Sequence, residues 1–232
     1  MKKLGLMVLC LMLMVLAACT PMPPVDQSDI VTLRGLYPAN DIAPAMASVA
    51  ERSLEEVLEI TKGYAVITVL ERLEDKQVDI MGPNSMTHEL NEKTLKIFEE
   101  LPEEEKKGAG PPQLLGIETY CHFKIRVEDV IWQQDEREGE ALKAGEEYVI
   151  SDNIMFLGAL RFLQKEGARL LVPLMWGAKD TPFENTLNVS RQWAFHTLED
   201  GRILCTAYGE ADDNFSGMAL EDYAQYVNKK MG

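Results

Sequence analysis

Apolar and polar side chains alternate along one long segment of the chain, between Gly116 and Trp132. Successive side chains of a β-strand point to opposite faces of the sheet, so this alternation predicts a strand with one buried and one solvated face. Its apolar positions are Cys121, Phe123, Ile125, Val127 and Ile131, and its polar positions are His122, Lys124, Arg126 and Glu128. Another strand is predicted over residues 64–71, where β-branched and apolar residues predominate.

Apolar residues recur at helical spacing in three other segments. Ser53 and Glu56 fit a capping box, in which the serine oxygen accepts a backbone hydrogen bond and the glutamate reaches back. They predict a short helix that ends before Gly63. Residues 86–101 predict an inserted amphipathic helix, and residues 219–229 predict a terminal helix docked on the domain through one face.

The segments between these elements carry weaker patterns. Residues 102–112, rich in glutamate, lysine and proline, are predicted to be a solvated loop. A short strand is predicted over residues 147–151, and the apolar residues 154–165 fit a helix or a strand equally well. Residues 169–175 predict a strand that Pro173 displaces toward a sheet edge or a bulge, because proline donates no hydrogen bond to a ladder.

The dipeptide Asp200-Gly201 predicts a tight β-hairpin. Both central residues of a type I′ turn need a positive φ, which favours aspartate followed by glycine. Counting outward from the turn, the predicted register places four pairs of residues opposite one another. These pairs are Glu199 with Arg202, Leu198 with Ile203, His196 with Cys205, and Trp193 with Tyr208.

The first residues of the chain have the pattern of an export signal. Lys2 and Lys3 precede an apolar run from Leu4 to Ala18, which matches the charged and the apolar regions of a signal peptide. The run is shorter than the roughly 20 apolar residues that a membrane-spanning helix needs. The sequence therefore predicts an exported chain from which the signal peptide, residues 1–18, is removed.

Residues 16–19, Leu-Ala-Ala-Cys, resemble the lipobox of bacterial lipoproteins. The resemblance implies cleavage before Cys19 and lipidation of its sulfur with a diacylglyceryl group, whose acyl chains are of the palmitate type. Two or more acyl chains anchor a protein stably to a bilayer, so we expect the chain at the extracytoplasmic face of the cell membrane. The prolines of residues 21–24 favour an extended spacer between this anchor and the domain.

The 232-residue chain is acidic, with a formal net charge of −15, and loss of the two lysines of the signal peptide makes the mature chain more acidic still. A hydrophobic share of 46% excludes a disordered or fibrous protein. The charge, without a basic stripe, excludes nucleic acid as the expected partner. We expect residues 19–50 to form the lipidated cysteine and an extended linker or arm. Residues 51–232 are expected to form one β-rich domain with a helical insertion near 86–107.

The predicted elements indicate a fold that is mainly β, or α+β by content. About five short strands between two helices favour a small, partly closed antiparallel β-barrel with flanking and inserted helices. The order of parts resembles a group of uncharacterised bacterial lipoproteins with an OB-like, netrin-like barrel domain. The resemblance rests on residues 54–57, 123–127, 166–171, 199–202 and 215–217. Netrin-type modules carry an N-terminal cysteine near the barrel, whereas Cys19 would be acylated and distant, so their inhibitor activity is not implied.

Two cysteines belong to the predicted domain, Cys121 and Cys205, because Cys10 leaves with the signal peptide and Cys19 carries the lipid. Export permits a disulfide between them, which is one alternative. Two buried, unreactive thiols are another. In the third, His196 lies opposite Cys205 in the hairpin and lowers the pKa of a reactive thiol.

Four aromatic residues are candidates for a platform on which a sugar or a peptide stacks, with core packing as the alternative. They are Trp132, Trp176, Trp193 and Tyr208.

Patterns typical of metal sites and of catalysis are missing from the sequence. The three histidines at positions 88, 122 and 196 have no metal-ligand spacing. Residues 212–214, Asp-Asp-Asn, lack the spaced pattern of a calcium loop, so a polar turn is expected there. We therefore expect no metal and no cofactor, and we assign no catalytic residue.

These patterns predict a membrane-anchored binding or interaction module whose ligand is an envelope protein, a peptide or a glycan. A cell-envelope enzyme with a scattered site and a structural envelope protein are the two alternatives. An enzyme should have a pocket lined by titratable groups with shifted pKa values. A module should have an exposed apolar or aromatic patch, and a structural protein should have neither.

Overall fold

The computed structural model describes residues 27–37, 52–61, 63–80, 86–109, 112, 114–134, 141–177, 181, 183, 185–206 and 214–232. Their fold is α+β with more strand than helix, as the sequence predicts. The strands number seven instead of about five, and they form one mixed sheet. Within these ranges no helix has the length and apolarity that crossing a membrane requires.

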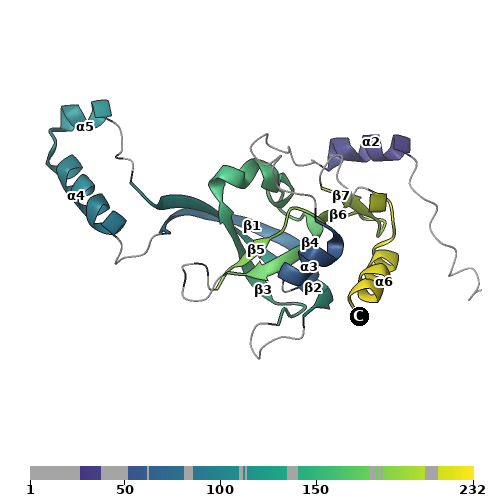
Figure 1. Ribbon diagram of the computed structural model, residues 1–232. Helices are drawn as coiled ribbons and strands as arrows, with labels where there is room; N and C mark the ends of the chain where they lie inside the picture. The colour runs from purple at the N-terminus through teal and green to yellow at the C-terminus, as the bar shows by residue number, and fades with distance from the viewer. Residues whose placement is uncertain are drawn as a thin grey trace, which may run out of the picture.

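The helices and strands follow one another along the chain as Figure 1 shows. In order they are α2 (Gln27–Leu36), α3 (Leu54–Ile60), β1 (Gly63–Asp79), α4 (Met86–Glu100), α5 (Glu103–Ala109), β2 (Ile117–Gln133), β3 (Glu147–Asn153), the 3-10 helix η2 (Ile154–Leu163), β4 (Arg169–Trp176), β5 (Leu187–Val189), β6 (Phe195–Thr197), β7 (Ile203–Cys205) and α6 (Leu220–Met231).

The sheet has the strand order β1-β2-β3-β5-β4-β6-β7, and β1 also pairs with β4. β1 is therefore hydrogen-bonded on both sides, to β2 and to β4. Every pairing is antiparallel except that of β3 with β5, which joins Ile150 and Leu187. Beyond β4, the short strands β6 and β7 extend the sheet, and Arg202 forms a bridge to Ala219 just before α6.

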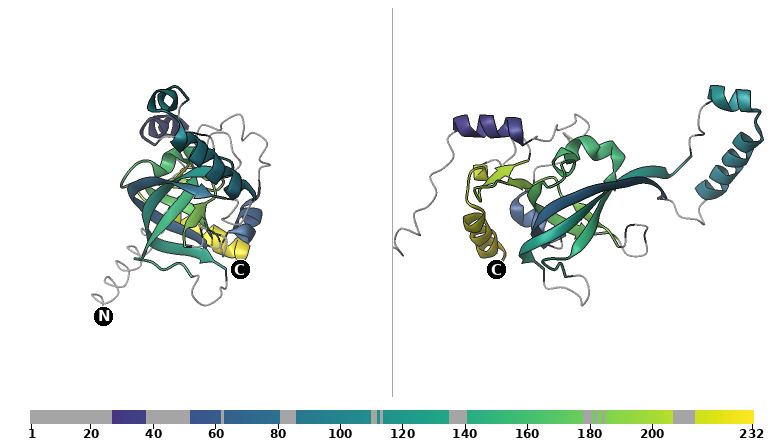
Figure 2. Two further views of the ribbon diagram at one scale, coloured as in Figure 1. Left: turned by 90° about the vertical axis from the view of Figure 1, so that its left-hand side faces the viewer. Right: turned by 180° about the vertical axis from the view of Figure 1, so that it is seen from behind.

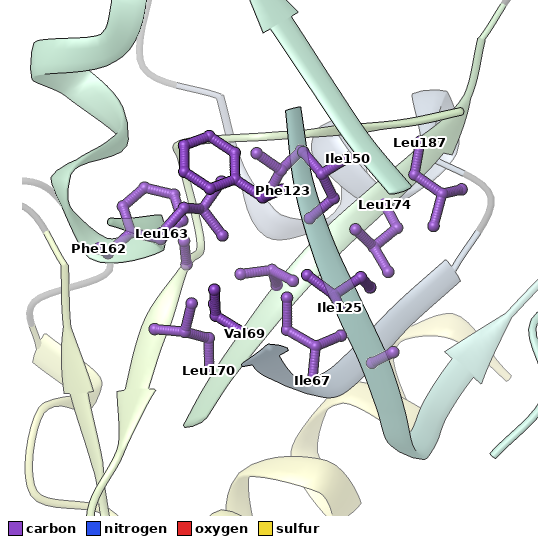
Figure 3. Packing of buried hydrophobic residues seen from close by; sticks show 14 of the residues in the cluster. Ile67, Val69, Phe123, Ile125, Ile150, Phe162, Leu163, Leu170, Leu174 and Leu187 are labelled. Atoms are coloured by element: carbon purple, nitrogen blue, oxygen red, sulfur yellow. The ribbon is translucent and has the colours of Figure 1, made fainter. Parts of the chain in front are cut away.

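Two hydrophobic clusters lie on opposite faces of β1 and β4. The first cluster includes Ile67, Val69 and Leu170, with side chains from β2, β3 and η2, and Figure 3 shows how these side chains point toward one another. The second cluster takes the alternate positions Tyr64, Val66 and Leu171 and packs them against α3, β6, β7 and α6. Residues 63–69 of β1 and residues 170–174 of β4 are thus buried between the two clusters, which explains the nearly continuous apolar sequence of these two segments.

The predicted capping box at the start of α3 is confirmed. The Ser53 Oγ accepts a hydrogen bond from the Glu56 N–H at 3.2 Å, and the Glu56 carboxylate accepts one from the Ser53 N–H at 2.7 Å. The helix ends at Ile60, with Thr61 as its C-cap, and thus before Gly63 as predicted. It buries Leu54, Val57 and Leu58 in the second cluster, as its apolar spacing predicts.

β1 and β2 continue past the sheet as a two-stranded arm that carries α4 and α5 (Figure 1). The predicted strands are confirmed, but β1 runs to Asp79 instead of ending near Glu71. β3 pairs with β2 only between residues 120 and 126, and β4 pairs with β1 only between residues 63 and 68. Residues 77–79 of β1 and residues 117–119 of β2, at the outer end, therefore pair only with each other within the described sheet.

The predicted inserted helix is confirmed as α4, whereas the predicted loop over residues 102–112 is wrong for most of its length, because residues 103–109 form α5. Glutamates occupy the first turn of α5 and lysines its last turn. This order stabilises a short helix through its macrodipole, and Lys106 forms an ion pair with Glu103 at 3.0 Å.

Pro173 does not place β4 at an edge, so that prediction is wrong. β4 pairs with β1 on one side and with β6 and then β5 on the other. The change of partner lies between Leu171, the last residue paired with β6, and Leu174, the first paired with β5. Pro173 lies in this break, where a backbone donor is not needed, and its carbonyl accepts from the Ser190 N–H at 3.0 Å.

The hairpin between β6 and β7 exists, but its predicted register is wrong by one residue. The observed pairs are Phe195 with Cys205, His196 with Leu204, and Thr197 with Ile203. The Leu198 N–H donates to the Arg202 carbonyl at 2.8 Å, which leaves a three-residue loop. Only its glycine has a positive φ, 84° at Gly201, and this geometry is typical of a type I turn followed by a bulge.

One further segment differs from expectation. Residues 27–36 form α2, although residues 19–50 were expected to form the lipidated cysteine and an extended linker or arm. The chain has no proline between Pro24 and Pro38, so a helix is possible there. The ambiguous residues 154–165 form the 3-10 helix η2 up to Leu163. The predicted terminal helix is confirmed as α6, and it buries Tyr223 and Val227 in the second cluster.

Candidate functional site

The outer part of the arm carries most of the exposed large apolar side chains among the described residues. Seven such side chains are at least 39% exposed, and five of them belong to the arm. We call these five side chains the arm patch: Ile80, Leu90, Leu95, Ile97 and Leu115. A monomeric protein rarely gathers exposed apolar groups in one place unless the surface binds something.

Asn91 fixes α4 against the chain that enters β2. Its side chain is 5% exposed, its amide donates to the Leu115 carbonyl at 2.6 Å, and its carbonyl accepts from the Leu115 N–H at 2.8 Å. His88 adds a second contact, with its Nδ1 3.4 Å from the Asp79 carboxylate at the end of β1. These bonds hold the helix in one orientation on the ribbon.

Leu90 and Ile97 point to the same side of α4, because residues seven apart lie on one face of a helix. They are 45% and 64% exposed. Between Met86 and Ala109 the chain has seven glutamates and four lysines, so the apolar residues lie in acidic surroundings. The sequence predicts the amphipathic helix, but its apolar spacing alone does not show that this face is left uncovered.

The two domain cysteines are free and buried, so the structure contains no Cys121–Cys205 disulfide. Cys121 lies in the first cluster and Cys205 in the second, and β1 and β4 separate these clusters. Burial is the main reason that the pKa of the Cys121 thiol is raised, with the Asp152 carboxylate adding to the effect. The arrangement is that of two buried thiols.

The structure does not place His196 opposite Cys205, because of the shifted hairpin register. Instead the His196 ring lies against the Tyr37 ring, with 5.2 Å between the ring centroids. The Cys205 carbonyl accepts a hydrogen bond from the Arg34 guanidinium of α2. The alternative of a reactive Cys205 thiol therefore has no support, because it depended on His196 as the cross-strand neighbour.

The four candidate platform residues are not brought together. Trp132 and Trp193 pack on the second cluster, and Trp176 packs on the first and forms an edge contact with Tyr148. Trp193 is 7% exposed, and its indole N–H donates to the Arg52 carbonyl at 2.9 Å. Tyr208 lies outside the described residues. Trp132, Trp176 and Trp193 follow the core-packing alternative.

A buried histidine and serine pair escaped the sequence analysis. His122 and Ser151 are cross-strand neighbours on β2 and β3, and the His122 Nε2 lies 3.2 Å from the Ser151 Oγ. Burial lowers the pKa of His122, while the Tyr120 carbonyl near its Nδ1 opposes this effect. Ser151 is completely buried, so its hydroxyl meets no substrate, and only the register of β2 with β3 reveals the pair.

Asp152 follows Ser151 and forms an ion pair with Arg191 at 3.3 Å. Burial raises the pKa of the Asp152 carboxyl, and the Arg191 charge opposes this shift. No group of three or more histidine, cysteine or acidic side chains within the described ranges is arranged to hold a metal ion. Asp212 and Asp213, the centre of the polar turn expected at 212–214, lie outside those ranges, as does Cys19.

Comparison with known proteins assigns no family. The chain matches no protein-family model, and no curated protein matches it significantly.

Proposed function

We propose that this protein is a lipid-anchored binding module outside the cytoplasm, and that its arm holds an envelope protein. The observation that carries the proposal is the arm patch, five exposed apolar side chains gathered on a projecting ribbon and its helix. An exposed patch of this kind is what distinguishes a module from an enzyme or a purely structural protein.

The anchor rests on the resemblance of residues 16–19 to a lipobox. Cys19 precedes Gln27, the first residue of α2, by eight residues, and eight extended residues span at most about 29 Å. α2 and α6 lie at one end of the described structure, while α4 and α5 lie at the other (Figures 1 and 2). A chain anchored near α2 would thus direct its arm away from that end.

A barrel of the OB type is part of the proposal. Pairings link β1 to β2, β2 to β3, β3 to β5, β5 to β4, and β4 back to β1, and η2 connects β3 with β4. OB folds bind their ligands in part through the connection between their first two strands. Here that connection is the arm itself, which supports a binding role for it.

The partner we propose presents an apolar groove with a basic rim. An amphipathic helix that binds in a groove uses anchors spaced by three, four and seven residues, and Leu90 and Ile97 have the last of these spacings. The excess of glutamate over lysine on α4 and α5 favours a positively charged border.

Site-specific photo-crosslinking in intact cells tests this partner. A photoreactive residue placed at Thr94, on the same face of α4 as Leu90 and Ile97, should give one discrete adduct, and Leu90→Ser with Ile97→Ser should abolish it. The matched control, Lys93→Ser with Lys96→Ser on the same helix, should preserve the adduct. Absence of any adduct, or an adduct made only with a second copy of this chain, would contradict the proposal.

The anchor is tested separately by the intact mass of the chain isolated from membranes. We expect a chain that begins at Cys19 and carries lipid, and Cys19→Ala should release the protein from the membrane fraction. A mature chain without lipid would disprove the anchor and leave the arm proposal to its own test.

A further inference from the structure

A cavity of about 270 Å³ lies beside the end of β6. β4 and β6 share only two residue pairs, Leu170 with His196 and Leu171 with Phe195. Outside these pairs the cavity extends between the turn that precedes β4 and the hairpin that follows β6. The polar side chains that line it are those of Tyr37, Lys165, Arg169, His196, Thr197 and Glu199.

One wall of the cavity is aromatic and depends on α2. Tyr37 follows this helix, and its ring packs against His196 at a centroid distance of 5.2 Å and an interplanar angle of 53°. Arg34 holds α2 in place through its hydrogen bond to the Cys205 carbonyl, and its side chain is buried. The Lys165 ammonium lies 5.7 Å from the centre of the Tyr37 ring, within the range of a cation–π contact.

The cavity brings together side chains that carry charges of both signs, Lys165, Arg169 and Glu199. Lys165 has no carboxylate partner and Glu199 has no cationic partner among the described residues. Arg169 uses its Nε to donate to the Glu128 carboxylate. A pocket lined by two cations and one carboxylate fits a ligand that carries both charges.

Thr197 adds a buried hydroxyl that forms no hydrogen bond with the described residues. Its side chain is 5% exposed, and its Oγ1 has no hydrogen-bond partner in the described part of the chain. Leaving a buried hydroxyl unpaired is destabilising. A ligand in the cavity removes that cost, because rotation about χ1 turns the hydroxyl toward it.

We propose that this cavity binds a free α-amino acid or the equivalent zwitterionic end groups of a short peptide. The carboxylate contacts Lys165 and Arg169, the ammonium contacts Glu199, and an apolar side chain packs on the Tyr37 ring. The volume lies just below the roughly 300–1,000 Å³ of pockets for drug-sized ligands, which suits a ligand of this smaller size. This site is separate from the arm patch and does not depend on it.

Calorimetric titration of the full chain in detergent tests the proposal with three probes that share one ring. Phenylalanine carries both charges, N-acetylphenylalanine lacks the ammonium, and phenethylamine lacks the carboxylate. We expect saturable binding of phenylalanine and at least tenfold weaker binding of the other two, since a tenfold change corresponds to about 1.4 kcal/mol.

Variants then locate the site. Lys165→Met and Glu199→Gln should each weaken phenylalanine binding about tenfold. Lys229→Met and Glu221→Gln, which change exposed residues of α6, should leave it unchanged. Thr197→Val should weaken binding and yet raise the stability of the free protein, a combination that simple damage to the fold does not produce.

Three results would overturn the proposal. No saturable binding of phenylalanine would remove the ligand class. Equal binding of either singly charged probe would show that the pocket does not recognise a zwitterion. Binding that Lys165→Met and Glu199→Gln leave unchanged would place the ligand elsewhere, and none of these results bears on the arm.

Discussion

Gly201→Ala tests the loop that sets the register of the β6–β7 hairpin. The added methyl group meets open space, because no heavy atom lies within 4 Å of a Cβ at this position. The whole effect therefore comes from the backbone, whose φ is 84° at Gly201. A left-handed conformation costs a residue with a Cβ about 1–2 kcal/mol. Reduced freedom of the unfolded chain returns about 0.4–1 kcal/mol, so we expect a net loss of about 1 kcal/mol.

Urea and thermal denaturation of the purified protein measure this loss. For a domain of this size, about 1 kcal/mol corresponds to a melting temperature lower by about 2–4 °C. Gly201→Asn should cost less, since asparagine tolerates positive φ. Gly35→Ala is the matched control, because its Cβ also meets nothing within 4 Å and its helical backbone has no positive φ. Equal effects of the two alanine substitutions would refute the three-residue loop.

Three further predictions concern the buried residues. The pKa of His122 is lower in the folded protein than in the unfolded chain. Between these two pKa values the unfolded chain binds a proton at His122 that the folded protein does not bind. The stability contributed by His122 is therefore complete above about pH 6.5 and falls as the pH drops below it. Urea midpoints measured against pH should fall less on acidification in His122→Asn than in the unchanged protein. Tyr64→Phe removes a bond of 2.7 Å from its hydroxyl to the Trp193 carbonyl, and denaturation should show a loss of about 1–2 kcal/mol. Cys121 and Cys205 should resist a thiol reagent in the native protein and both react in urea, whereas a fast native reaction of either would contradict their burial.

The elements that the sequence predicts well are those in which one local rule decides the structure. The Ser53 capping box needs only two side chains three residues apart, and the strand at β2 needs only alternation. The inserted helix and the terminal helix follow from apolar spacing in the same way. In each case the neighbours along the chain carry enough information to fix the element.

The predictions that fail depend on contacts between distant segments. Nothing near Pro173 reveals that the partner of β4 changes from β6 to β5 at that point. The one-residue error in the hairpin arises because Asp200-Gly201 fits both a two-residue and a three-residue loop. That error moved His196 from Leu204 to Cys205, since a slip of one residue exchanges the two faces of a strand.

The candidate sites were harder to predict than the fold for the same reason. The pocket joins residues from α2, the turn before β4 and the β6–β7 hairpin, and no motif connects Tyr37 with Lys165 or Glu199. The arm patch consists of apolar residues that look like an ordinary buried helix face in the sequence. Ile97 is exposed because α4 lies at the outer end of the arm, away from the sheet (Figure 1), and its local sequence does not reveal this position.

The arm patch lies outside the two hydrophobic clusters, and this predicts how stability and binding separate. Ile67 is completely buried in the first cluster, and Ile67→Ala should cost about 2–5 kcal/mol through lost burial and a new cavity. Ile97 is 64% exposed, and Ile97→Ala should change stability by no more than about 0.5 kcal/mol. Denaturation of the two variants measures the difference. If Ile97→Ala cost as much as Ile67→Ala, the side chain would be part of a core, and the arm would lose its claim to be a binding surface.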